Sequence, residues 1–207
     1  MTDRTRFNES WLSEQPMGID PIDSYDGLVF NIKDLMRYGL KPVADGPGIM
    51  KIETSISIYY WFGTETTYDL IVEIEKTPQA YVARLIGKNP DLAKGPPYAA
   101  DLYAHIADTA PLSVRFMSDT QMTGAAKKIW KNLFKNGRYI TIYDRDQPGQ
   151  TYKTFDNLND FEDFFKHGDH YYKRYQYVLS RSNTIAEARS FFNTRRMREL
   201  CGFDLHD

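Results

Sequence analysis

The chain has 207 residues, of which 42% are hydrophobic and 14% aromatic, and its 26 basic and 28 acidic residues give a net charge of −2. This length suffices for one large domain with extensions, and the charge balance provides no overall field that would attract nucleic acid or an anionic membrane. The single cysteine, Cys201, excludes an intramolecular disulfide and a cysteine-based metal site. No apolar run reaches the length of a signal-peptide core or a membrane span, so we expect a cytoplasmic protein without a membrane partner.

The first predicted elements are an arm, a helix and a loop. Residues 1–24 are polar and contain two prolines and one glycine, which predicts an extended N-terminal arm. Residues 28–40 repeat apolar side chains at helical spacing and end near Gly39, which predicts a helix. The proline and glycine content of residues 41–48 then predicts a loop.

A three-stranded antiparallel meander is predicted next. Apolar and polar residues alternate in "KIETSISIYYWF" (51–62), and they do so again in residues 68–76 and 80–88. This period of two is typical of half-buried strands, and the short turns between the three stretches favour antiparallel pairing.

After the meander, the pattern changes to alternating helices and strands. A helix is predicted over residues 98–109, where Leu102, Tyr103 and Ile106 share one face. The later predicted elements are a strand over 111–119, a helix over 123–137, strands over 138–144 and 151–155, and helices over 157–167 and 184–199.

The connection that precedes the helix at 98–109 is rigid and basic. The segment "LIGKNPDLAKGPPY" (85–98) holds Lys88 and Lys94 together with two glycines and three prolines. A helix start presents backbone N–H groups without helical partners, and nearby lysines make it suited to hold an anion. The alternative is a proline-stiffened connection whose lysines are only solvated.

The order helix, meander, helix, strand, helix, strand, together with "KGPPYA" (94–99), resembles the GNAT superfamily of acyl-CoA-dependent N-acyltransferases over roughly residues 25–156. The resemblance implies an α+β fold with a GNAT-like mixed, mostly antiparallel central sheet flanked by helices. An N-terminal arm (1–24) and a helical C-terminal extension (157–207) would be added to this domain. The resemblance also implies transfer of a small acyl group from acetyl-CoA, or another acyl-CoA, to an amine.

In that superfamily, a loop patterned Arg/Gln-x-x-Gly-x-Gly/Ala binds the CoA pyrophosphate. Gly95 and Ala99 can take the small positions here, whereas Pro97 stands where a second glycine is expected and removes one N–H donor. The resemblance implies that the pyrophosphate contacts Lys88, Lys94, Gly95, Tyr98 and Ala99. It implies that the ends of two splayed strands hold the pantetheine, at Ile86, Gly87 and Ser118.

Acylation of an amine needs a base that accepts a proton from the nucleophile. The resemblance implies that this base is a carboxylate, for which the sequence offers Glu75 and Asp119. Glu73 lies on the same strand face as Glu75 and could also serve. The alternative for Glu73 and Glu75 is a solvent-facing pair at a sheet edge.

The departing thiolate needs an acid. In the superfamily this acid is often a tyrosine on the helix that follows the fifth strand, and the spacing would place it at Trp130. An indole cannot donate a proton as a phenol does. We therefore expect a tyrosine of the following strand to act as the acid, either Tyr143 or Tyr139.

A first alternative function is a non-catalytic or nucleic-acid-directed binding or modification protein on the same fold. The C-terminal third interleaves aromatic and basic residues, a composition that can bind nucleic acid and that also serves amphipathic packing. Its cations are Lys173, Arg174, Arg181, Arg189, Arg195, Arg196 and Arg198.

A second alternative is a divalent-metal nuclease. Asp69, Glu73, Glu75 and Lys76 are the residue types of the PD-(D/E)xK nucleases, although the spacing of the lysine departs from that motif. The histidines are scattered, and "HGDH" (167–170) has no partner cluster elsewhere in the sequence. No metal site is therefore predicted.

Overall fold

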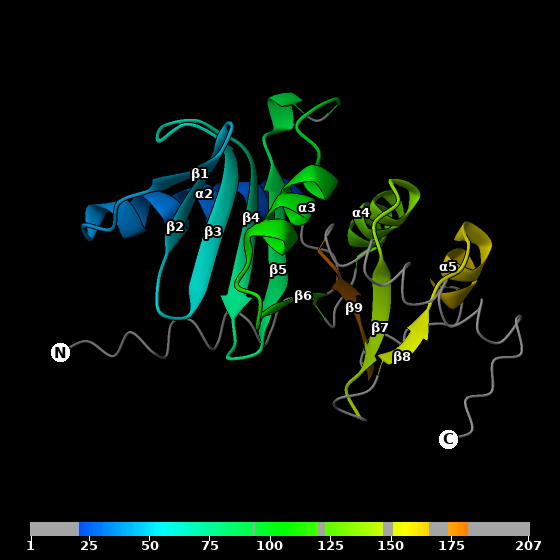
Figure 1. Ribbon diagram of the computed structural model, residues 1–207. Coiled ribbons are helices and arrows are strands. Elements are labelled where there is room, and N and C mark those ends of the chain that lie inside the picture. Colours follow the sequence, from blue (N-terminus) through cyan, green and yellow to red (C-terminus); the bar gives the residue numbers. More distant parts are fainter. Residues whose placement is uncertain (1–20, 93, 120–122, 147–150, 166–173, 182–207) are drawn as a thin grey trace, which may run out of the picture. The chain divides into compact units, whose positions relative to one another are not determined.

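The computed structural model describes residues 21–92, 94–119, 123–146, 151–165 and 174–181 (Figure 1). The chain divides into two units. Unit 1 comprises Met1–Lys76 and Ala83–Ala99, and unit 2 comprises Thr77–Val82 and Ala100–Asp207. Among the described residues, no helix is both long enough and apolar enough to cross a bilayer.

In its described residues, unit 1 combines helix α2 with a sheet that is hydrogen-bonded in the order β1-β2-β3-β4-β5. Helix α2 spans Pro21–Arg37, so residues 21–24, which the sequence places in the arm, belong to this helix. The strands are β1 (Val43–Gly46), β2 (Ile49–Glu53), β3 (Ser57–Gly63), β4 (Tyr68–Lys76) and β5 (Ala80–Lys88), and the first residues of β5 belong to unit 2. The pairs β1–β2, β2–β3 and β3–β4 are antiparallel.

The prediction of one strand over residues 51–62 is wrong, because these residues form the hairpin of β2 and β3. The hydroxyl of Thr54 accepts hydrogen bonds from the N–H groups of Ile56 (3.2 Å) and Ser57 (2.9 Å), which closes the turn. Neither glycine nor proline marks this turn, so the apolar alternation runs through it unbroken. The predicted loop at 41–48 also contains a short strand, β1.

Helix α2 covers one face of the sheet of unit 1 (Figure 1). Leu28 and Ile32 of this helix pack against Ile52, Trp61 and Ile71, and each of these five side chains is at most 1% exposed. Burial of these five large apolar side chains stabilises the unit by about 1.5–3 kcal/mol for each side chain. The helix therefore forms where its apolar stripe meets the sheet.

Apart from Thr77–Val82, unit 2 follows the short 3-10 turn η1 (Pro90–Leu92) and the start of α3 (Ala99–Thr109). Its later elements are β6 (Arg115–Ser118), α4 (Gly124–Lys135), β7 (Ile140–Asp144), β8 (Thr151–Thr154), α5 (Leu158–Phe165) and β9 (Tyr175–Leu179). These strands are hydrogen-bonded in the order β6-β9-β7-β8. Because β9 is antiparallel to both β6 and β7, these two strands are parallel to each other, and α4 connects them.

An aromatic core holds the helices of unit 2 against one face of its strands. Ring centroids lie 5.1 Å apart for Tyr103 of α3 and Phe116 of β6, and 5.5 Å apart for Trp130 of α4 and Tyr177 of β9. Phe161 of α5 also contacts Tyr177, at 5.6 Å. Such separations are typical of favourable aromatic pairs. The helix predicted at 123–137 is confirmed as α4, and its Trp130 and Leu133 are buried.

The expected α+β class with mostly antiparallel strands is confirmed. The C-terminal extension is not helical throughout, because residues 175–179 form strand β9. Its first predicted helix corresponds to α5, whereas the helix predicted over 184–199 lies outside the described residues. Insertion of β9 between β6 and β7 makes this extension part of the sheet.

Candidate functional site

The basic loop begins directly at the end of β5. The N–H of Asn89 donates to the carbonyl of Asp69 (2.9 Å), and the Asn89 side chain accepts from the N–H of Asp91 (3.0 Å), which starts η1. Gly95 adopts a φ of +97°, a backbone conformation that other residues rarely accept. The segment is therefore a strand, a structured turn and a helix, as the sequence predicts.

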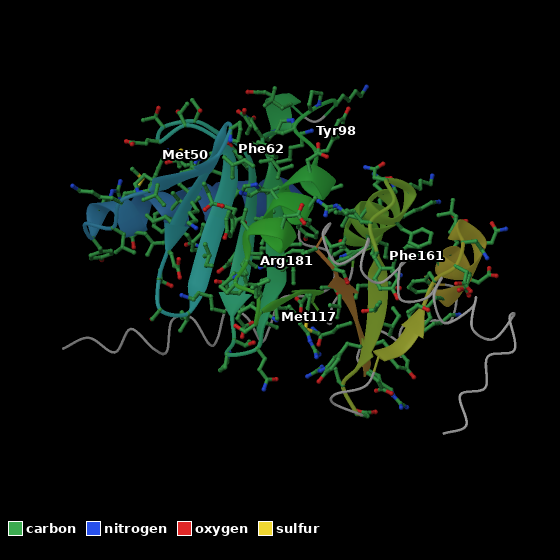
Figure 2. The ribbon with its side chains drawn as sticks, in the orientation of Figure 1. Met50, Phe62, Tyr98, Met117, Phe161 and Arg181 are labelled. Carbon is green, nitrogen blue, oxygen red and sulfur yellow. The ribbon has the colours of Figure 1, made fainter. Side chains whose placement is uncertain are left out.

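Lys88 spans this loop. Its ammonium donates to the carbonyl of Gly95 and lies 5.8 Å from the ring centroid of Tyr98, within the range of a cation–π contact. The Tyr98 side chain is itself 55% exposed, on the connection that leads into α3 (Figure 2). Since an ammonium has three donors, the bond to Gly95 orders the loop and leaves the charge of Lys88 beside the helix start.

The start of α3 supplies the remaining donors. Ala99 begins the helix, so the first backbone N–H groups, from Ala99 onward, have no helical acceptor. Lys94, on the loop that precedes Ala99, is exposed. The N–H groups without acceptors and the charge of Lys94 both favour a bound anion. Asp101 in the first helical turn has the opposite effect, because a carboxylate there already interacts with the positive end of the helix.

Ile86 and Gly87, which the resemblance assigns to the pantetheine, contact the first turn of α2. The Ser24 hydroxyl donates to the carbonyl of Ile86 (3.3 Å). A Cβ at position 87 would lie 2.6 Å from the Tyr25 Cα, so only glycine allows β5 and α2 to approach this closely. The structure thus gives Gly87 a packing role on this side of β5.

Two of the three carboxylates of β4, Glu73 and Glu75, differ in their surroundings. Glu75 is exposed and forms an ion pair with Arg84, whose Nε lies 3.3 Å from the carboxylate. Glu73 is half-buried and accepts a hydrogen bond from the buried phenol of Tyr59 (2.9 Å). Burial raises the pKa of Glu73, while the Tyr59 bond and Arg84 oppose this rise. Glu73 is therefore a carboxylate whose protonation depends on its surroundings in the fold.

Replacement of Glu73 by glutamine should flatten the pH dependence of the free energy of unfolding. A carboxyl group whose pKa is raised by folding stabilises the native state while it is protonated, and this contribution is lost as the pH rises through the raised pKa. Glutamine keeps an acceptor for Tyr59 but does not ionise. Urea denaturation from pH 4 to pH 8 should show the variant gaining stability relative to wild type as the pH rises. Glu75→Gln is the matched exposed control, and equal slopes for Glu73→Gln and wild type would contradict the expectation.

In unit 2, buried polar side chains gather where the parallel strands β6 and β7 end. Ser118 is the last residue of β6, Asp144 is the last of β7, and Gln176 is the second of β9; their exposed fractions are 1%, 2% and 8%. The carboxyl ends of parallel strands are frequent sites of ligand binding. Burial of polar groups at this edge therefore makes it a second candidate site, within unit 2.

Ser118, the third predicted pantetheine residue, connects β6 to β9. Its hydroxyl accepts a hydrogen bond from the N–H of Tyr177 (2.9 Å), and its carbonyl accepts one from the side-chain amide of Gln176 (2.7 Å). The predicted base Asp119 follows at once and is half-buried. Burial, and to a smaller extent the charge of Asp119, raises the pKa of the Tyr103 phenol.

The predicted acid Tyr143 lies on β7 directly opposite Gln176 of β9. The guanidinium of Arg115 on β6 is 5.8 Å from the Tyr143 ring centroid. Partial burial and the nearby Asp156 raise the pKa of Tyr139, the other predicted acid. Trp130, at the position expected for the family's tyrosine, is 1% exposed in the aromatic core, so the acid cannot be at this position.

Two features of these sites were not predicted: the hydrogen bond between Tyr59 and Glu73, and the buried side chain of Gln176. The alternation of "YQYVL" (175–179) could have identified β9, since Tyr175, Tyr177 and Leu179 are buried toward the helices and Gln176 lies on the other face. The aromatic and basic composition around it instead indicates nucleic-acid binding or amphipathic packing within a helical extension. The cross-strand contact between Tyr59 and Glu73 depends on register, which sequence alone does not give.

Some of the residues that suggested the alternative functions form ion pairs within the chain. Lys76 is paired with Glu53, and no group of three or more His, Cys, Asp or Glu in the described part of the chain could hold a metal ion. Of the basic C-terminal residues, Arg174 makes a two-point ion pair with Asp144 (2.9 and 2.7 Å), and the Nη2 atom of Arg181 is buried. The other five cations lie outside the described residues.

The resemblance to the N-acyltransferases depends on the order of the elements and on the loop before α3. In unit 2, the strands β6 and β7 and the helix α4 follow that order, and β9 is added between the two strands. Comparison with family models, with curated proteins and with solved structures finds no match to this chain.

Proposed function

We propose that the protein is an acyl-CoA-dependent N-acyltransferase that moves a small acyl group to an amine. The observation that carries the proposal is the connection between β5 and α3, where Lys88, Lys94 and the first N–H groups of the helix occur together. A diphosphate is the ligand chemistry that suits a helix start flanked by lysines. The same loop is the one whose sequence resembles the CoA-binding loop of the GNAT superfamily.

The order of elements gives further support. A helix, an antiparallel meander, the helix α3, strand β6, helix α4 and strand β7 follow one another as the resemblance requires. The carboxyl ends of β6 and β7 supply a carboxylate and a phenol at one edge of unit 2. We therefore propose a GNAT-like fold and favour Asp119 over the exposed, ion-paired Glu75 as the base.

The proposed reaction has two bond changes. The amine nitrogen attacks the thioester carbonyl, a C–N bond forms, and the C–S bond breaks. Asp119 accepts the proton that the amine loses, and Tyr143 donates a proton to the departing thiolate, so that an amide and free CoA result. Most of the rate enhancement would come from holding the two substrates together.

Acetyl-CoA should bind and raise the unfolding temperature. At a concentration of 100 times Kd the expected stabilisation is about 2.7 kcal/mol, or roughly 5–10 °C for a chain of this size. Lys94→Glu should weaken binding roughly tenfold to hundredfold, because it replaces a favourable charge at the diphosphate by a repulsive one. Calorimetric titration measures the binding affinity, and thermal denaturation measures the unfolding temperature. Lys41→Glu is the control, since Lys41 is an exposed lysine of the same unit. Absence of both heat and a thermal shift would exclude the proposal.

A nucleic-acid-directed protein remains the alternative proposal. Two cations of its expected contact region lie in the described part of the chain: Arg174 is ion-paired with Asp144, and the Nη2 atom of Arg181 is buried. This observation favours the transferase. Single-stranded oligonucleotides belong in the same titration, where binding of the oligonucleotide without binding of acetyl-CoA would reverse the preference.

A further inference from the structure

Gln176 is an unusual residue for the centre of a sheet. It lies on β9 with both neighbouring strands in place, and its side chain is 8% exposed. A buried amide without hydrogen bonds is unfavourable, and an apolar side chain of the same size would pack at this position without that cost. Packing alone therefore does not account for a glutamine here.

The amide of Gln176 holds one particular peptide group. Its Nε2 donates to the carbonyl of Ser118 over 2.7 Å, and that carbonyl belongs to the peptide bond that joins Ser118 to Asp119. Backbone pairing of β6 with β9 includes Phe116 with Leu179 and Met117 with Val178, and the Ser118 hydroxyl takes the next N–H of β9. The Gln176 bond thus acts at the end of β6, where the chain turns toward Asp119.

The same residue faces the predicted acid. Gln176 and Tyr143 are direct partners in the antiparallel pair of β9 and β7, so their side chains emerge on the same face. Arg115 of β6 contacts the Tyr143 ring although β9 lies between their strands, so this contact passes over β9. Gln176 therefore lies on the strand between β6, which leads into Asp119, and β7, which carries Tyr143.

We propose that Gln176 is a positioning residue for acyl transfer, one that fixes the Ser118–Asp119 peptide group so that the Asp119 carboxylate stays at a set distance from Tyr143. The inference rests on the proposed function. The role proposed for Gln176 is to position Asp119, whereas the loop before α3 binds the cofactor and Asp119 and Tyr143 transfer protons. Misplacement of a reacting group by about 1 Å can lower a rate roughly a hundredfold, so one hydrogen bond at this position can matter.

Two substitutions of the same size test the proposal. Gln176→Met removes every hydrogen bond, and Gln176→Glu removes the donor while its carboxylate is ionised. Both should lower the rate of CoA release from acetyl-CoA in the presence of a panel of primary amines, by roughly tenfold to a hundredfold. The Kd for acetyl-CoA should stay within about twofold of wild type, because the loop before α3 is unchanged.

The pH dependence separates positioning from a purely structural role. A protonated glutamic acid at position 176 can again donate to the Ser118 carbonyl, so the rate of Gln176→Glu relative to wild type should recover as the pH falls. Gln176→Met has no such group and should show no recovery. Val178→Ala is the matched control, since Val178 lies on the same face of β9 and should keep the wild-type profile.

The outcomes distinguish this inference from the proposed function. If wild type binds acetyl-CoA and releases CoA, but Gln176→Met reacts at the wild-type rate, the positioning role is wrong and the transferase stands. Equal loss in both variants without recovery at low pH would also overturn it, because that result indicates a structural defect. If wild type neither binds acetyl-CoA nor releases CoA with any amine, the proposed function and the positioning role both fail.

Discussion

Replacement of Trp130 by alanine should lower the free energy of unfolding by about 3–5 kcal/mol, the usual cost of truncating a fully buried tryptophan. Its indole is 1% exposed and contacts rings of three other elements, namely Tyr103 of α3 at 5.9 Å, Phe116 of β6 at 6.2 Å and Tyr177 of β9 at 5.5 Å. Alanine would leave a cavity at the point where these elements meet. We expect unit 2 to lose most of its stability.

Urea denaturation followed by far-UV circular dichroism measures this loss. Trp130→Phe should recover more than half of it, since a phenyl ring keeps part of the aromatic contacts. Phe30→Ala is the control, because Phe30 is 62% exposed on α2 and its truncation should change the free energy of unfolding by no more than about 0.5 kcal/mol. A loss below 1 kcal/mol for Trp130→Ala would contradict the described core.

Replacement of Gly87 by alanine should destabilise unit 1 by roughly 1–3 kcal/mol, the range found when a side chain is forced into a packed site. The added Cβ would lie 2.6 Å from the Tyr25 Cα and 2.9 Å from the Tyr25 backbone nitrogen. Both atoms are main-chain atoms of α2, so relief requires that the helix move away from β5. The first turn of α2, including the bond from Ser24 to the Ile86 carbonyl, should be affected most.

Hydrogen exchange of the α2 amides, together with urea denaturation, measures the effect. Gly124→Ala is the control, since a Cβ there meets no atom within 4 Å and alanine favours a helix. Titration with acetyl-CoA separates packing from ligand contact. A stable Gly87→Ala variant with weakened acetyl-CoA binding would return Gly87 to the pantetheine site and remove its packing role.

Elements with a strong and uninterrupted pattern could be predicted from the sequence. The lysine-rich helix with Trp130 and Leu133 inward appears as α4, and the alternating segment at 68–76 appears as β4. The loop at 94–99 also leads into a helix as expected. In each case local spacing and tertiary packing require the same structure, which is the condition under which patterns are informative.

The elements that were missed depend on information that lies elsewhere in the chain. The turn at Thr54 forms through a side-chain hydroxyl within a run that alternates on both sides of it. Strand β9 is a strand because β6 and β7 provide two open edges for it, and nothing in residues 175–179 records those partners. For the same reason, the role of Gln176 in the candidate site could not be predicted, since Gln176 contacts Ser118 only once β9 has paired with β6.

The place of β9 has a consequence for the way the nascent chain acquires its structure. Phe116 has no partner on the β9 side of its strand until Leu179 has been synthesised, although α4 and β7 precede Leu179 in the chain. Two hydrophobic strand edges therefore stay open for much of translation, which is the situation in which chaperones engage a growing polypeptide. Pairing of β9 with β6 and β7 is therefore a late step in the folding of unit 2. Its timing depends on the separation of these strands in the sequence rather than on the strength of any one contact.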